Sequence, residues 1–110
     1  MITITGNPIS INALYRGRRF LTENGKSKKK EYDIEIRRQW KKKIIKGDVE
    51  VCVDAYFKDK HRRDLDGIFK ALLDSMSGLV YEDDSQIARL SIDRYYDKNS
   101  PRVEITIYEL

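Results

Sequence analysis

The chain is poor in the residues from which several common kinds of site are built. It has one cysteine among its 110 residues, Cys52, so an intrachain disulfide is excluded. Cys52 lies in the apolar run 49–57, and we interpret it as a buried structural thiol in a reducing compartment. The one histidine, His61, has no histidine or cysteine neighbours, which leaves a zinc site almost without support.

Long hydrophobic runs are also missing. No apolar run approaches the roughly 20 residues of a membrane span, and residues 1–5 lack the charged and apolar regions of a signal peptide. We therefore expect a soluble, cytoplasmic protein without a membrane partner. Its 110 residues predict one domain spanning residues 1–110, and so small a domain would gain stability from oligomerisation.

The charge is divided unevenly along the chain. The net charge is +4, but residues 16–46 contain 13 Lys or Arg against four Asp or Glu, a local excess of +9. The remainder carries nine basic and 14 acidic residues, which gives −5. A basic block can neutralise phosphates and release their counterions, while an acidic group can hold cations. This division is what a metal-dependent nuclease would need, although a solvated helix rich in lysine would look similar.

Apolar spacing predicts the order of the secondary structure. Alternating or helical periods indicate, in chain order, a strand at 1–5, a helix at 28–46 capped by Gly47, a strand at 48–57, a helix at 64–76 ending near Ser77-Gly78, and strands at 86–96 and 102–108. Residues 7–27 show no period, so we expect a long loop or a short hairpin there. The order predicts an α+β domain, a four-stranded mixed β-sheet with two helices packed on it.

The second predicted helix carries charged residues on its polar face. Asp66, Lys70 and Asp74 are four residues apart and share that face. A structural interpretation is available, because Asp64 as N-cap and Asp66 in the first turn would stabilise the helix by about 0.5–2 and 0.3–1 kcal/mol. An Asp66–Lys70 ion pair would add about 0.2–0.5 kcal/mol. Taken alone, the Asp-x-Asp spacing favours this structural interpretation.

The surroundings of the helix favour a metal centre instead. Arg62 and Arg63 precede the acids and supply ligands for phosphate. Asp83 and Asp84 supply further carboxylates at the start of the next strand, after a connection short enough to fold back near the N-terminus of the helix. Neighbouring residues on a strand point to opposite faces, so we expect one of the two to reach a metal directly. Two or three carboxylates can hold Mg²⁺, which activates water for phosphodiester hydrolysis without a histidine base.

The chain resembles the RusA-type Holliday junction endodeoxyribonucleases almost from end to end. The family opens with a Pro-x-Ser-x-Asn-x-x-Tyr-Arg type segment, found here at residues 8–16. The family's core is Asp-x-Asp-Asn-x-x-Lys-x-x-x-Asp, followed by a turn and Asp-Asp-x-Gln, which matches residues 64–74 and 83–86. Gly67 stands where the family has Asn. A glycine has no side chain to orient a ligand and weakens the first helical turn, but the carboxylates remain.

The resemblance implies a Mg²⁺-dependent homodimer, with Mn²⁺ able to substitute, that cuts four-way DNA junctions symmetrically in recombination and repair. It implies that Asp64, Asp66 and Asp84 are the metal-binding catalytic carboxylates and Lys70 the catalytic lysine. Asp83 is an auxiliary candidate for the metal, and Asp74 fits a role in supporting the helix. We expect DNA contacts from the arginines at five positions: Arg16, Arg18, Arg19, Arg62 and Arg63. For the first three, an ordinary mobile basic loop would account for the sequence equally well.

Two other functions stay open on the sequence alone. The first is a non-catalytic DNA-binding protein, a decayed nuclease whose acids merely cap a helix. Such a protein would bind DNA in a salt-dependent manner but would cut nothing when Mg²⁺ or Mn²⁺ is added. The second, a metal-dependent phosphohydrolase of small nucleotides, is disfavoured because the chain has no Gly-rich phosphate loop and its basic block suits a polymer better.

Overall fold

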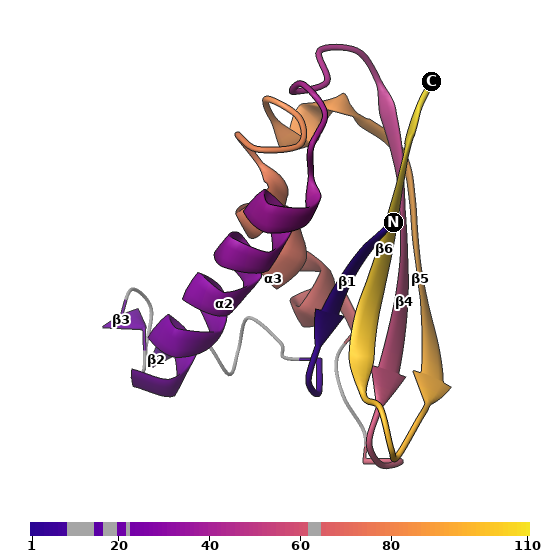
Figure 1. Ribbon diagram of the computed structural model, residues 1–110. Helices are drawn as coiled ribbons and strands as arrows, with labels where there is room; N and C mark the ends of the chain where they lie inside the picture. Colours follow the sequence, from indigo (N-terminus) through magenta and orange to yellow (C-terminus); the bar gives the residue numbers. More distant parts are fainter. Residues whose placement is uncertain (9–14, 17–19, 22, 62–64) are drawn as a thin grey trace.

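A mixed four-stranded sheet forms the centre of the computed structural model, which describes residues 1–8, 15–16, 20–21, 23–61 and 65–110 (Figure 1). The strands lie in the order β1-β6-β4-β5, with bounds Ile2–Thr5 for β1, Val49–Phe57 for β4, Ile87–Tyr96 for β5 and Arg102–Glu109 for β6. β6 is antiparallel to β1 and to β4, whereas β4 and β5 run parallel. Two helices pack against the sheet, so the predicted α+β architecture is confirmed.

One face of the sheet is covered and the other is open. Both helices, α2 (Glu23–Gln39) and α3 (Leu65–Met76), lie on the same side of the sheet in Figure 1. In β4 every second residue is buried, from Val49 to Phe57, which is the alternation expected of a strand with one covered face. The three valines and Phe57 each contribute about 1.5–3 kcal/mol by leaving water, and Ala55 contributes less. In β5, by contrast, no residue is fully buried.

α2 occupies a different range from the predicted one. The prediction of a helix at 28–46 capped by Gly47 is wrong at both ends, because the helix runs over Glu23–Gln39. Beyond it, the Ile45 amide donates to the Val80 carbonyl at 2.8 Å, and Ile45 forms a parallel bridge with Tyr81. Ile45 is buried in this extended form. The helix therefore ends at Gln39, although the apolar spacing continues beyond it, because Ile45 pairs with a distant segment.

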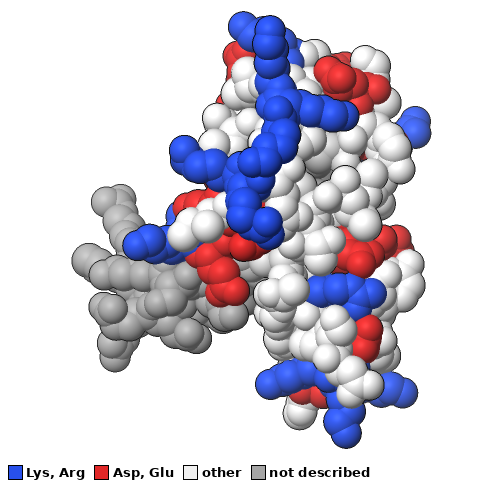
Figure 2. All heavy atoms as spheres, viewed as in Figure 1, with Lys and Arg blue, Asp and Glu red and all other residues white. Residues whose placement is uncertain are grey.

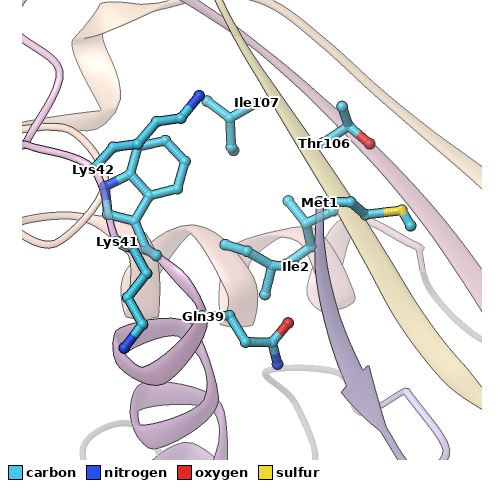
Figure 3. Close-up of a pocket in the computed structure, with 9 residues that line it drawn as sticks. Met1, Ile2, Gln39, Lys41, Lys42, Thr106 and Ile107 are labelled. Carbon is cyan, nitrogen blue, oxygen red and sulfur yellow. The ribbon is translucent and has the colours of Figure 1, made fainter.

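The side chain of Gln39 joins the end of α2 to the edge of the sheet. Its Nε2 donates to the Thr3 carbonyl at 2.7 Å, and its Oε1 accepts from the Thr3 amide at 2.8 Å. Figure 3 shows Gln39 beside β1, next to a hollow whose rim includes Lys41 and Lys42. Because β1 is an edge strand, its outward backbone groups need partners. Gln39 supplies them at Thr3 without a fifth strand.

α3 connects the two parallel strands. A parallel pair requires a crossover, so α3 begins after the end of β4 and β5 begins only beyond the other end of the helix. Ile68, Leu72 and Met76 are fully buried on its apolar face, as the spacing predicted. The helix is followed by Ser77 and by Gly78, whose φ of 86° is the left-handed conformation that favours glycine after a helix.

The region predicted as a loop or hairpin contains a short antiparallel pair. β2 (Tyr15–Arg16) pairs with β3 (Phe20–Leu21), so the hairpin interpretation is confirmed for the part that the structure describes. No helix among the described residues is long and apolar enough to cross a membrane.

Candidate metal and nucleic-acid site

The structure places some of the predicted site residues and leaves others out. Asp66, Lys70, Asp83 and Asp84 lie in described segments, and all four are exposed. Asp64, Arg18, Arg19, Arg62 and Arg63 lie outside the described residues. Arg16 is placed in β2 by its backbone alone. The geometry therefore bears on the carboxylates of α3 and of the turn before β5.

Asp83 and Asp84 belong to a tight helical turn. The prediction that they begin a strand is wrong, because Asp84–Gln86 forms a 3₁₀ turn, η1, and β5 starts only at Ile87. Asp83 is the N-cap, and its Oδ2 accepts from the Ser85 amide at 3.0 Å. This bonding with Ser85 lowers the pKa of the Asp83 carboxyl. The two acids therefore do not alternate across a sheet, and Asp83 uses one oxygen for the cap.

The side chain of Gln86 fixes this turn to the segment before β4. Its Oε1 accepts from the amides of Glu82 and Asp83 at 2.8 and 2.9 Å. Its Nε2 donates to the carbonyls of Ile45 and Gly47, both at 2.8 Å. We call residues 82–86 the acidic turn. The Gln86 amide thus closes the capping box of η1 and binds the acidic turn to residues 45–47.

Asp84 also has a partner inside the protein. The Tyr81 hydroxyl donates to Asp84 Oδ1 at 3.1 Å, and Tyr81 itself is fully buried. Burial raises the pKa of the Tyr81 phenol, and the carboxylates of Asp84, Asp74 and Asp83 raise it further. The phenol therefore stays protonated and remains a donor. Sequence reasoning missed Tyr81, because nothing in its position distinguishes it from an ordinary core tyrosine.

The polar face of α3 carries the charged residues that the spacing predicted, but the ion pair considered between the described residues Asp66 and Lys70 is not formed. Asp66, Lys70 and Asp74 are all exposed on the helix. No ion pair joins Lys70 to either acid in the part of the chain that the structure describes. The structural interpretation of Lys70 as half of an Asp66–Lys70 pair is therefore wrong.

Asp66 and Asp84 lie at opposite ends of α3. Asp74 lies in the last turn of the helix, and the segment that leads to Asp84 lies at the same end, because Ser77 pairs with Tyr81 and the Ser77 hydroxyl donates to the Glu82 carbonyl at 3.5 Å. The helix rises about 12 Å between Asp66 and Asp74, whereas Mg²⁺ holds its ligands at about 2.1 Å. The prediction that Asp84 folds back near the N-terminus of the helix is therefore wrong. Accordingly, the described residues of one chain contain no group of three acids, histidines or cysteines that could hold a metal ion.

A basic segment lies directly beside the acidic turn. Lys41, Lys42, Lys43 and Lys46 are exposed in the stretch that follows α2, and Figure 2 shows basic side chains gathered over the end of α2 and this stretch. Lys46 Nζ lies 3.8 Å from Glu82 Oε1, and Gln86 binds the backbone on either side of Lys46. The fold thus places positive side chains next to the turn that carries Asp84. The charge division along the chain suggested a basic block beside an acidic group, but it did not indicate which lysines and which acids would meet.

The open face of the sheet has the opposite charge pattern. Asp54 lies in register with Asp93 on β5 and with Glu104 on β6, so three acids cross the sheet side by side. Burial, together with the charges of Asp93 and Glu104, raises the pKa of Asp54. A row of acids repels a phosphate backbone. Arg102 Nε lies 2.8 Å from Glu104 Oε2 and neutralises one of the three acids, so the row keeps a smaller acidic excess.

An α+β domain with exposed carboxylates beside a basic segment has the features of a protein that acts on phosphodiesters. The chain matches the family described as Endodeoxyribonuclease RusA over residues 4–108, nearly its whole length, and it belongs to that family. It is also 38% identical over 47 residues to the uncharacterized protein YqaN of Bacillus subtilis (strain 168). That match covers 43% of this chain and 32% of the relative, so the chain spans about a third of the relative's length.

Proposed function

We propose that the protein is a Mg²⁺-dependent endodeoxyribonuclease that resolves four-way DNA junctions by symmetric phosphodiester hydrolysis in recombination and repair, in the cytoplasm. The observation that carries the proposal is the basic segment beside the acidic turn, held there by Gln86 and by the 3.8 Å approach of Lys46 to Glu82, in a chain of the RusA family. The lysines would neutralise phosphates and bring the strand to Asp84.

The residues present fit a hard divalent cation. Asp66 and Asp84 are exposed carboxylates, and Asp64 adds a third by sequence. Asp84 Oδ1 is held by Tyr81, which leaves Oδ2 for a ligand bond. Such oxygen donors suit Mg²⁺ and Mn²⁺, and Asp83 is an auxiliary ligand. The bound metal would activate water and stabilise the leaving oxygen, while the exposed ammonium of Lys70 would hold a phosphate oxygen.

We propose further that a homodimer completes the metal centre. Because Asp66 lies in the first turn of α3 and the segment that carries Asp84 is bonded to Ser77 beyond its last turn, we infer that one chain does not direct both to the same ion. Two chains related by a two-fold axis can place Asp66 of one protomer beside Asp84 of the other, and the axis then generates two equivalent centres. A four-way junction offers two equivalent strands to such a pair, which accounts for symmetric cutting.

The reaction is tested with a synthetic four-way junction and a matched linear duplex, each with and without Mg²⁺. We expect paired symmetric nicks in the junction only, and only with the metal. Asp64→Asn and Asp84→Asn should abolish cutting and leave junction binding intact, whereas Asp48→Asn, the same change at an exposed acid outside the site, should cut normally. Normal cutting by either site variant refutes its assignment. Binding without cutting in any divalent metal would instead indicate a non-catalytic DNA-binding protein.

The shared centre is tested by mixing two inactive variants. In a heterodimer of Asp66→Asn and Asp84→Asn chains, one centre carries both substitutions and the other carries neither. Random exchange should therefore restore about a quarter of the wild-type centres. If each centre lay within one chain, every centre in the mixture would carry a substitution and no activity would return.

A further inference from the structure

We propose that Tyr81 is a positioning residue that orients the Asp84 carboxylate toward the metal. The proposal rests on the metal-binding role proposed for Asp84. The hydroxyl of Tyr81 holds Oδ1 at 3.1 Å from inside the protein, so that Oδ2 is directed toward a ligand. Residues that hydrogen-bond a ligating carboxylate commonly set its orientation and its affinity for the ion.

The backbone of Tyr81 is fixed on both sides. Tyr81 forms parallel β-bridges with Ile45, which precedes β4, and with Ser77, which follows the end of α3. The Gly78 amide donates to the Tyr81 carbonyl at 2.7 Å. The side chain is among the largest that are completely buried, so neighbouring atoms enclose the ring. The hydroxyl is therefore a donor of fixed position at the boundary of the core.

Asp84 needs such a donor more than a residue in a regular element would. It lies in a turn of three residues, and it is exposed. In the described part of the chain, its side chain has one hydrogen bond, the one from Tyr81. Without that bond the carboxylate would exchange among staggered rotamers, and binding a metal would first have to order it. Gln86 fixes the backbone of the turn, and Tyr81 fixes the carboxylate.

Tyr81→Phe separates positioning from packing, because it keeps the ring and removes the hydroxyl. Tyr108→Phe is the matched control, since Tyr108 is 51% exposed at the far end of β6. Mn²⁺ binding is measured directly by electron paramagnetic resonance on the intact protein without DNA, so that no cutting accompanies the titration. Cleavage rate is then measured against Mg²⁺ concentration, together with junction affinity and thermal midpoint.

We expect Tyr81→Phe to bind Mn²⁺ about tenfold more weakly and to need about tenfold more Mg²⁺ for half-maximal cutting. Junction affinity should be unchanged, and the rate at saturating Mg²⁺ should recover most of the wild-type value. A merely structural role would lower the thermal midpoint and leave the half-saturating Mg²⁺ unchanged. In the Asp84→Asn background, Tyr81→Phe should have no further effect on Mn²⁺ binding.

The outcomes distinguish the two proposals. If the wild type neither binds Mn²⁺ nor cuts, the proposed function fails. If the wild type does both and Tyr81→Phe has the same metal dependence, only the positioning role fails. Should Tyr81→Phe not fold, the wild type labelled with fluorotyrosine serves instead: the ¹⁹F line displaced by Asp84→Asn must also be displaced by Mg²⁺, and an unmoved line overturns the inference.

Discussion

We expect removal of the Gln86 side chain both to loosen the acidic turn and to lower the free energy of unfolding. Gln86→Ala deletes two acceptor bonds to the amides of Glu82 and Asp83 and two donor bonds to the carbonyls of Ile45 and Gly47. All four bonds lie between 2.8 and 2.9 Å, and the two donor bonds join the turn to a segment about 40 residues away in the chain. The turn would then be held to the segment before β4 by fewer bonds.

The magnitude follows from the number and exposure of these bonds. A typical intramolecular hydrogen bond contributes about 0.5–1.5 kcal/mol net. Gln86 is partly exposed, so water can replace its side chain at some of these groups, and the lower half of that range applies. Four bonds then give a loss of about 2–4 kcal/mol in the free energy of unfolding, which lowers the thermal midpoint by roughly 10–20 °C.

Urea denaturation followed by circular dichroism measures this loss as a lower midpoint with an unchanged slope. Asn99→Ala is the control: it removes an exposed amide from the turn between β5 and β6 and should change stability by less than about 0.5 kcal/mol. Mg²⁺-dependent cutting should also fall in Gln86→Ala below the temperature of unfolding. A loss under 1 kcal/mol with normal cutting would refute the reasoning that Gln86 anchors the turn.

Three further predictions concern the rest of the fold. Gln39→Ala removes the two bonds to the backbone of β1 and should lower the free energy of unfolding by about 1–3 kcal/mol, as measured by urea denaturation. Leu72→Ala opens a cavity at a fully buried position and should lower it by about 2–5 kcal/mol. Asp54→Asn should instead raise it at pH 7, by about 0.2–1 kcal/mol, because burial and the charges of Asp93 and Glu104 raise the pKa of Asp54 and so disfavour its charged form in the fold. The native state binds the extra proton, so this gain should shrink as the pH falls through the pKa of folded Asp54; an increasing gain in denaturation curves at lower pH would contradict it.

Local pattern was sufficient for the elements that are long and strongly periodic. The alternation from Val49 to Phe57 predicted β4 almost to the residue, and the apolar spacing within 64–76 predicted α3. Each of these elements buries one face, so its apolar residues recur in the sequence with the period of a strand or of a helix. The range 28–46 shows where local pattern fails. The helical spacing continues past Gln39, but Ile45 pairs with Val80 and Tyr81 and does not continue the helix.

The sequence by itself determined the family, the mixed α+β fold and the candidate carboxylates, because each depends on residue type and spacing. Only the tertiary structure decided where those carboxylates lie. The parallel pairing of β4 with β5 makes α3 a crossover, and that crossover separates Asp66 from Asp84 by most of the helix. The same pairing brings the acidic turn to the lysines after α2. Spacing along a chain cannot reveal such contacts, since they depend on which strands become neighbours.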